Sequence, residues 1–457
     1  MTKRIILALF VLSSLSSVFA LESLSLDLAK EIALENHLDY LSVQASRDKA
    51  ESTKKSAFYS YLPSANLSGN HTRYEPESMM TGKYSNQIGI SVTQPLLANG
   101  SIYYNNKIQQ ANSLSSEISV KQKRIEVLTQ VEILYYNVLE TQKNFQIAQS
   151  NVERAEQAYK NGKIKFQQNV ISKDQLLRLQ VDATKKAITQ LNSKSAYSDA
   201  YRALKVYLNT SGNFTLQEVD FVEDGRASDK LNISGKFSLH EDGTLIKGNQ
   251  AYDRLLKGLV DLSSQQNPQI ALAKSGINLA TYSLNQQKSS FLPSLNLSLN
   301  HNWSASEASS DFEDQTTLML NASLSLFPLV NKYHNVTAQK MNLKAVNYNY
   351  QSLLSGIESN IETSLNSYLI SIERIELAKQ TLTLNEEIFK QKKTMYDSNL
   401  ISVDDYLDAQ VEMDQARVQY NSALYGYLKS QSSLRSTIGL ENNSEFENII
   451  TLVLKEK

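Results

Sequence analysis

The distribution of proline constrains this chain more than any other feature of its sequence. All six prolines of the 457 residues fall in two short windows, at Pro63, Pro76 and Pro95 and at Pro268, Pro293 and Pro328. Residues 96–267 and 329–457 contain none. A proline in a helix interior costs about 3 kcal/mol, because it removes a backbone donor and clashes with the preceding turn. The proline-free tracts therefore predict long helices that bracket extended segments.

Apolar spacing within these tracts supports the prediction of helices. Residues 101–161 lack glycine, and apolar residues recur there in steps of mostly three and four, at Leu128, Val131, Tyr135, Val138, Phe145, Ala148, Val152, Ala155 and Tyr159. A second set has Ile361, Leu365, Tyr368, Ile372, Ile375, Ala378, Leu382 and Phe389. Such spacing is typical of a coiled-coil seam. At 1.5 Å per residue, a helix from Ser101 to about Phe166 would be roughly 100 Å long, which no single globular core requires.

The proline windows show the period of two that is typical of strands. Apolar residues alternate with mostly polar ones, for example at Leu295, Leu297 and Leu299 and at Leu318, Leu320 and Ala322. We expect strands near 64–75, 86–97, 294–304 and 316–327. Segments of about ten alternating residues are typical of a transmembrane β-barrel. A half-buried sheet of a soluble protein would show the same alternation.

The N-terminus predicts secretion. Lys3 and Arg4 precede an apolar run from Ile5 to Val11, and a small-x-small pattern ends at Ala20. This order predicts a signal peptide of residues 1–20. No later stretch approaches the roughly 18 consecutive apolar residues of a membrane-spanning helix, so strands would have to make any membrane crossing.

Composition excludes several classes of function. The chain has no cysteine, which excludes disulfides, thiolate metal sites and an acylated N-terminal cysteine. Its 46 basic and 47 acidic residues give a net charge of -1, so no overall field attracts nucleic acid. No nucleophile elbow, phosphate loop or zinc motif occurs. We therefore expect no enzyme, no metal site and no cofactor; His71 and His301 are interpreted as ordinary strand residues.

The chain is an internal duplication. A shift of 230 places Leu62-Pro63-Ser64 on Leu292-Pro293-Ser294, and the segment 169–172 on 399–402. Each repeat is predicted to contain helix, strand, strand, long helix, turn and helix. Two strand hairpins cannot close a barrel, and an open sheet edge leaves its backbone groups unpaired in lipid. The pattern therefore predicts an oligomer that pools its strands.

With these features the sequence resembles the TolC family of outer-membrane efflux proteins. The motifs are the Leu-Pro before each first strand, the Gln94-Pro95-Leu96 and Phe327-Pro328-Leu329 exits, and the turn Tyr396-x-x-Asn-Leu-Ile-Ser-x-Asp-Asp-Tyr-Leu-Asp408. The resemblance covers essentially the whole mature chain. It implies a mainly α fold with a transmembrane β-barrel: a homotrimer in the outer membrane whose chains share twelve strands, continued into the periplasm by an α-helical tunnel.

The resemblance also divides the chain into parts. These are the signal peptide 1–20, the first repeat 21–210 with its turn at 167–172, an equatorial insertion 211–261, the second repeat 262–440 with its turn at 397–402, and a C-terminal equatorial tail 441–457.

The resemblance assigns roles to residues of the two turns. Contact with a periplasmic adaptor is implied for Asn169, Val170, Ile171, Ser172, Asn399, Leu400, Ile401 and Ser402. A pore gate is implied for Asp405, Asp408 and Tyr396. The two asparagines replace the family's glycine and should accept positive φ, and Ser172 with Gln175 predicts a capping box. Ile401 and Lys160 depart from the family's arginine latch and its acidic partner, and the residues by themselves predict no more than helix ends and solvated charges.

The predicted function is that of a passive exit duct in a tripartite efflux or type I secretion system. It would carry small toxic compounds or secreted proteins. Its implied partners are the adaptor and an inner-membrane transporter of the RND, ABC or MFS type, which would supply the energy. The alternative is a secreted trimeric coiled-coil adhesin or structural envelope protein, and a soluble periplasmic enzyme ranks third.

Overall fold

The computed structural model describes residues 23–80, 82–218, 250–307, 309–325, 327, 329–442 and 446. The signal peptide predicted at residues 1–20 lies outside the described residues, and so do most of the predicted insertion and tail. The chain divides into two compact units. The helical unit comprises residues 1–41, 123–267 and 357–457, and the strand unit comprises 42–122 and 268–356. Each unit therefore takes segments from both sequence repeats.

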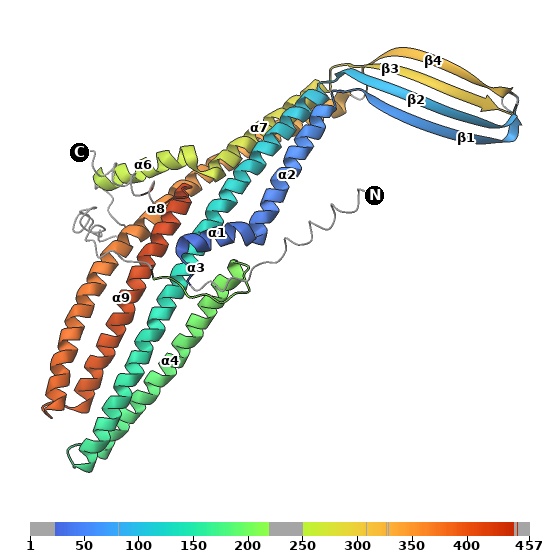
Figure 1. Ribbon diagram of the computed structural model, residues 1–457. Helices are drawn as coiled ribbons and strands as arrows, with labels where there is room; N and C mark the ends of the chain where they lie inside the picture. The colour runs from blue at the N-terminus through green and yellow to red at the C-terminus, as the bar shows by residue number, and fades with distance from the viewer. Residues whose placement is uncertain are drawn as a thin grey trace. The chain divides into compact units, whose positions relative to one another are not determined.

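The strand unit contains one antiparallel sheet of four strands in the order β1-β2-β3-β4 (Figure 1). Its strands are β1 Ser64–Ser78, β2 Gly82–Ala98, β3 Ser294–Ser306 and β4 Ser309–Ser323. The two hairpins are joined by pairing of β2 with β3, so the strands of the two repeats form one continuous sheet. Helix α7 Pro268–Ser289 belongs wholly to this unit, and α2 Leu38–Tyr59 belongs to it from residue 42.

The register of the strands places their apolar residues on one face of the sheet. Leu67 pairs with Ile90, Val92 with Leu299, and Leu297 with Leu320. Directly opposed residues of neighbouring strands share a face, so the predicted alternation produces a continuous apolar surface. The opposite face carries mainly serine, threonine and asparagine, as in the pairs Asn66↔Ser91, Ser91↔Asn300 and Asn296↔Asn321.

The fourth strand differs from the sequence prediction. We expected it near 316–327, but it begins at Ser309 and ends at Ser323. Ser323 pairs with Ser294, the first residue of β3. Beyond this pair β4 has no partner on β3, which ends the strand although the apolar alternation continues.

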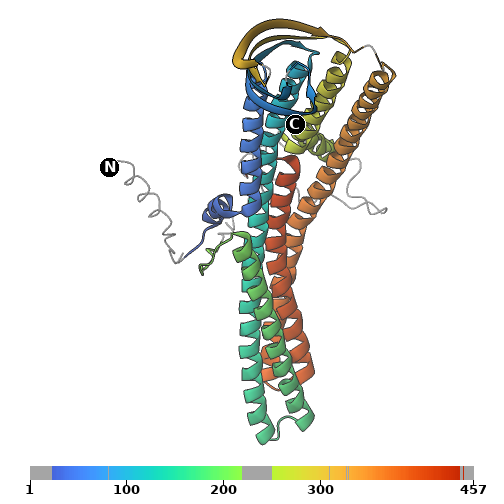
Figure 2. The ribbon, with the colours of Figure 1, turned by 90° about the vertical axis from the view of Figure 1, so that its right-hand side faces the viewer.

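The helical unit is built from long helices. Its elements are α1 Leu26–Asn36, α4 Lys173–Tyr207, α6 Gln250–Gln266, α9 Val403–Ile438, and the C-terminal parts of α3 Ser101–Gln167 and α8 Leu329–Asp397. Within this unit α3, α4, α8 and α9 lie side by side along their lengths (Figures 1 and 2). Every residue of the two predicted apolar seams is buried or half-buried. Among the described residues, no helix is both long enough and apolar enough to cross a membrane.

A buried ion cluster joins α1, α3 and α9. The carboxylate of Glu132 contacts Arg435 Nη2 at 2.6 Å and Lys30 Nζ at 2.6 Å, and it accepts a hydrogen bond from Ser432 at 2.5 Å. Burial alone would raise the pKa of Glu132, but Arg435 and Lys30 outweigh burial and lower it. The cluster holds three helices that are far apart in the sequence.

Candidate functional site

Both inter-helix turns lie at one end of the helical unit (Figures 1 and 2). The α3–α4 turn has Asn169 at φ 59°, and the α8–α9 turn has Asn399 at φ 60°. Asparagine tolerates this left-handed region because its short polar side chain bonds locally. The backbone closes alike in both turns: Val170 N–H donates to Lys165 O at 2.8 Å, and Leu400 N–H to Met395 O at 2.8 Å. The prediction of positive φ at both asparagines is confirmed.

A serine caps the helix that follows each turn. Ser172 and Gln175 form a capping box on α4, in which Gln175 N–H donates to Ser172 Oγ at 3.2 Å. Ser402 and Asp405 form the same box on α9, and Ser402 Oγ also donates to Asp405 Oδ2 at 2.7 Å. The hydroxyl and backbone N–H of Ser402 lower the pKa of Asp405. The Asp405 carboxylate is thus held at the helix start, while Asp408 lies exposed one turn further along.

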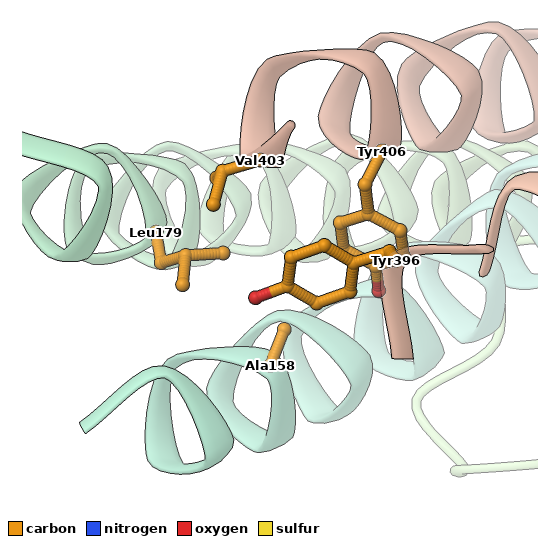
Figure 3. Packing of buried hydrophobic residues seen from close by; sticks show 5 residues of the cluster. All are labelled: Ala158, Leu179, Tyr396, Val403 and Tyr406. Atoms are coloured by element: carbon orange, nitrogen blue, oxygen red, sulfur yellow. The ribbon is translucent and has the colours of Figure 1, made fainter. Parts of the chain in front are cut away.

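An apolar cluster lies behind the two turns. It consists of Ala158, Leu179, Tyr396, Val403 and Tyr406 (Figure 3). The rings of Tyr396 and Tyr406 stack with centroids 4.6 Å apart. Burial, and then the proximity of Tyr396, raises the pKa of Tyr406 to about 12. Tyr396, predicted to belong to the pore gate, is only 5% exposed in the single chain, and its hydroxyl finds no hydrogen-bond partner among the described residues.

Basic residues of the α3–α4 hairpin reach the α8–α9 hairpin. Lys165 Nζ donates to Tyr396 O at 3.0 Å and to Asn399 Oδ1 at 2.8 Å. The same ammonium lies 4.3 Å from the centroid of the Tyr396 ring, which is within the range of a cation–π contact. Arg178 Nη1 donates to Asp404 Oδ1 at 2.8 Å. These contacts hold the two turns at the same height along the helix axes.

Farther from the turns, one carboxylate of the α8–α9 hairpin contacts both helices of the α3–α4 hairpin. Asp414 on α9 accepts from Arg154 on α3 at 2.6 Å and from Lys186 on α4 at 2.6 Å. Gln410, fully buried, donates through Nε2 to Asp182 at 3.5 Å. Burial and the neighbouring Asp414 raise the pKa of Asp182. The Oε1 atom of Gln410 has no partner in the described part of the chain.

The structure distributes the predicted adaptor-contact residues unequally. Val170 is 45% exposed and Leu400 is 71% exposed. Ile171 and Ile401 instead pack, half-buried, against the apolar cluster. The two turns therefore present one apolar side chain each. Within the described ranges no group of three or more His, Cys, Asp or Glu residues is arranged to hold a metal ion.

Sequence reasoning missed the residues that join the hairpins. Neither Lys165 nor Arg178 belongs to a motif, although the shift of 230 places Arg178 on Asp408, a residue of opposite charge. Gly162 was also missed: a Cβ at this position would overlap the Leu179 side chain. The glycine lets α3 and α4 approach closely just above their turn.

The chain matches one family model and several solved structures. The model described as OEP, outer membrane efflux protein, matches residues 30–210 and 259–440. In fold the chain is similar to CusC (TM-score 0.75, 15% identity, 91% of this chain and 92% of that chain). It is similar to the CmeC outer membrane channel of Campylobacter jejuni (0.73, 18%, 94% and 90%) and to the open state of the MtrE outer membrane channel of Neisseria gonorrhoeae (0.71, 15%, 91% and 89%). No curated protein matches the sequence.

Proposed function

Since this chain belongs to the outer membrane efflux protein family and is located in the outer membrane, we propose that it is the exit duct of a tripartite efflux or type I secretion system. It acts as a channel and not as an enzyme, carrying small toxic compounds or secreted proteins. The observation that carries the proposal is the combination, in both repeats, of a strand hairpin with one apolar face and two long helices that meet at a turn.

The sheet supports a barrel shared between copies. Strands β1 and β4 are its edges, and open edges leave backbone groups unpaired in lipid. Three copies would supply twelve strands, each copy joining β4 to the β1 of the next, with the apolar face toward lipid. Replacing Leu320 by arginine on that face should lower trimer yield, at a cost of about 2–4 kcal/mol at mid-membrane. Asn321→Arg, on the other face, is the matched control, and equal yields would contradict the barrel.

The parts of the chain then have distinct tasks. The repeats 21–210 and 262–440 form barrel and tunnel, while the insertion 211–261 and the tail 441–457 wrap the tunnel at its equator. Two contacts support this arrangement: Leu24 N–H donates to Thr215 O at 2.7 Å, and Arg124 contacts Glu441 at 3.0 Å. The first contact fastens the beginning of the insertion to the segment that precedes α1, and the second fastens the beginning of the tail to α3.

The two turns form the docking surface for a periplasmic adaptor, through which an RND, ABC or MFS transporter delivers its substrate. The exposed side chains of Val170 and Leu400 support this assignment. The variant Val170→Asp/Leu400→Asp would bury unpartnered carboxylates in that contact, which is costly. Surface substitutions otherwise change stability by less than about 0.5 kcal/mol. We expect a normal amount of heat-stable trimer with export lost.

Export is measured as drug susceptibility or as retention of a secreted substrate. The control is Gln157→Asp/Thr383→Asp, which adds the same charge on exposed polar positions of α3 and α8. Normal export by the turn variant would show that the adaptor binds elsewhere. Failure of that variant to form trimers would show that the turns serve only the fold.

The pore gate is proposed at Asp405, Asp408 and Tyr396. Residues three apart on a helix share a face, so a trimer would gather six carboxylates at the narrow end of the tunnel. Planar-bilayer recordings should show a cation preference. Asp405→Asn/Asp408→Asn removes the charge but keeps an acceptor for the α9 cap, so the preference should fall without loss of folding. Unchanged ion selectivity would contradict the proposed ring of carboxylates but not the proposed exit duct.

The contacts of Lys165 and Arg178 take the place of the family's arginine latch in this proposal. They restrain the α8–α9 hairpin where Ile401 and Lys160 offer no such link. Lys165→Ala/Arg178→Ala should therefore raise the single-channel conductance, because the turn of one hairpin is no longer bonded to the turn of the other. Conductance equal to that of the unmodified channel would exclude these residues as restraints.

A further inference from the structure

The helix ends next to the sheet carry a concentration of positive charge. Residues 52–62, 99–116, 268–293 and 324–357 lead into or out of the strands, and together they contain eight lysines and no aspartate or glutamate. Because the whole chain has a net charge of -1, its remaining residues are net acidic. The distribution of charge over a surface, and not only the overall balance, determines which ions and partners that surface attracts.

Four of these lysines lie close to the sheet, one on each helix. Lys55 and Lys288 come shortly before the ends of α2 and α7, and Lys107 and Lys332 come shortly after the starts of α3 and α8. At 1.5 Å per residue, each lies within about 9 Å of its helix end. We call these four residues the lysine collar.

All four helix ends lie at the same end of the sheet, as the ends of α2 and α7 show in Figure 1. Strand β3 starts at Ser294, which pairs with Ala98 at the end of β2 and with Ser323 at the end of β4. Ser64, the first residue of β1, pairs with Thr93 near the end of β2. The lysine collar therefore follows one edge of the sheet, and all of it belongs to the strand unit.

The collar lysines are largely without carboxylate partners. Lys107, Lys288 and Lys332 form no ion pair within the described part of the chain, and Lys55 reaches Glu51 only at 3.9 Å. Lys55 and Lys288 are also exposed. Ammonium groups bind phosphate oxygens through charge-assisted hydrogen bonds. The collar can therefore receive anions from outside the chain.

Exposed aromatic rings lie at the same helix ends. Phe58 of α2 is 62% exposed, Tyr103 of α3 is 52% exposed, and Phe291, just after α7, is 42% exposed. Lys107 Nζ lies 5.9 Å from the centroid of the Tyr103 ring, and Lys332 Nζ lies 5.6 Å from that of Phe291. Aromatic rings and lysines gather at the headgroup level of membranes, where the ring contacts acyl chains and the ammonium reaches the phosphates.

The link between α2 and β1 reaches the sheet on its apolar face. Gln94 pairs with Leu297, and directly opposed residues share a face, so Gln94 lies on the apolar face. Its side chain donates to the backbone oxygen of Tyr61 at 3.0 Å. The aromatic segment that ends α2 therefore adjoins the face that is directed toward lipid in the proposed barrel.

We infer that the lysine collar binds the phosphate groups of anionic phospholipids in the membrane leaflet that faces the periplasm. The inference rests on the proposed duct, which places the sheet in the membrane and the helices below it, and adds a site of lipid recognition. Each lysine near an anionic membrane surface contributes roughly fivefold to the affinity. A trimer would present the four collar lysines of every copy to that leaflet.

The other end of the sheet has the opposite charge. Residues 64–98 and 294–323 contain six acidic and two basic residues, and all six acidic residues lie at 75–77 and 307–314, beside the two hairpin loops. A lipid phosphate at that end of the sheet would meet carboxylates. Charge complementarity therefore assigns the anionic lipid to the leaflet next to the helices.

Lipid binding by the purified trimer tests the inference. The full-length protein in detergent is titrated with phosphatidylglycerol, which is anionic, or with phosphatidylcholine, which has no net charge, and native mass spectrometry counts the bound lipids. The trimer should prefer phosphatidylglycerol, and added salt should weaken the preference. Lys55→Gln/Lys107→Gln/Lys288→Gln/Lys332→Gln should lower the affinity for phosphatidylglycerol at least about tenfold and leave that for phosphatidylcholine unchanged.

The matched control removes four exposed lysines of the helical unit, in the variant Lys194→Gln/Lys379→Gln/Lys390→Gln/Lys393→Gln. It makes the same change in net charge and should bind phosphatidylglycerol like the unmodified protein. Lys288→Gln alone serves if the fourfold collar variant forms no trimer, because a surface substitution usually changes stability by less than about 0.5 kcal/mol. It should lower the affinity for phosphatidylglycerol roughly fivefold.

The outcomes separate the inference from the proposed function. Equal affinity of the trimer for the two lipids, or a collar variant that binds phosphatidylglycerol like the control, would overturn the inference and leave the duct. A collar variant with unchanged lipid binding but a stronger cation preference in planar bilayers would place these lysines in the lumen instead. Failure of the unmodified protein to form trimers would contradict the proposed function itself.

Discussion

The two inter-helix hairpins are copies of one another that have kept their backbones and exchanged their charges. Asn169 and Asn399 adopt the same positive φ, and Ser172 and Ser402 cap the following helices in the same way. In the half nearer the turns, the hairpin α3–α4 nevertheless supplies cations, whereas α8–α9 supplies the carboxylates that receive them. Positions that the backbone constrains have stayed alike, because few residues accept left-handed φ or cap a helix.

Side chains between the hairpins were free to become complementary. At the shift of 230, Arg178 stands where the second repeat has Asp408, and Lys165 stands where it has Met395. An identical pair of hairpins would place like charges against each other, which is destabilising. The two hairpins arose by duplication but are no longer equivalent, because the charged side chains of one now complement those of the other.

The largest expected effect comes from removing the carboxylate on which two cations converge. Asp414→Ala leaves Arg154 and Lys186 without the carboxylate that they share, and both side chains are mostly buried. Breaking a buried ion pair from one side is strongly destabilising, and we expect a loss of about 2–4 kcal/mol. The free energy of unfolding is measured by denaturant titration of the purified protein.

Arg417→Ala is the control for this prediction. Arg417 pairs with Glu386 inside the α8–α9 hairpin, and both side chains are partly exposed. A pair of this kind contributes about 0–1 kcal/mol. Equal losses of unfolding free energy from Asp414→Ala and Arg417→Ala would show that ion pairs between the hairpins contribute no more stability than an ion pair within one hairpin.

The elements could be predicted from the sequence, but their contacts could not. Proline placement, heptad spacing and alternation act through the local backbone, so the long helices and the four strands followed from them. The asparagine turns and serine caps followed for the same reason. The end of β4 depended on where its partner strand begins. The burial of Tyr396 and the links from Lys165 and Arg178 depended on which helix faces meet, and no local pattern encodes that choice.

A smaller effect, of opposite sign, is expected at Asp182. Burial and Asp414 raise the pKa of Asp182 above its ordinary 3.8, so the folded protein holds this proton more tightly than the unfolded chain does. The stability gained from the proton is complete below pH 3.8 and is lost as the pH rises through the folded pKa. Asp182→Asn cannot lose that stability, and its amide N–H can also donate to the unpartnered Gln410 Oε1.

The Asp182→Asn variant should therefore unfold at a higher temperature than the unmodified protein at neutral pH. The difference should shrink as the pH is lowered toward 3.8. Melting temperatures across a pH series test both statements. A difference independent of pH would attribute the gain to the new hydrogen bond alone.

The two turn asparagines should respond differently to the same substitution. Glycine accepts positive φ without strain, so Asn169→Gly should be nearly neutral. Asn399→Gly also removes one of the two acceptors of Lys165 Nζ, and a hydrogen bond from a charged donor at an exposed site contributes about 0.5–1 kcal/mol. Denaturant titration of the two variants in parallel measures the difference. Identical behaviour would mean that the Lys165 contact adds no stability.

The smallest effect on stability is expected from removing the hydroxyl of Tyr396. This substitution tests whether the ring or the hydroxyl of Tyr396 joins the two hairpins. Its ring stacks on Tyr406 and lies beneath Lys165, while its buried hydroxyl has no partner among the described residues. Burying a hydroxyl without a hydrogen bond is unfavourable, so Tyr396→Phe should leave stability unchanged or raise it by up to about 1 kcal/mol. Tyr396→Leu, which loses both ring contacts, should instead destabilise the protein. A loss of stability in Tyr396→Phe as large as that in Tyr396→Leu would show instead that the stabilising contact is made by the hydroxyl, through a hydrogen bond to a neighbouring copy.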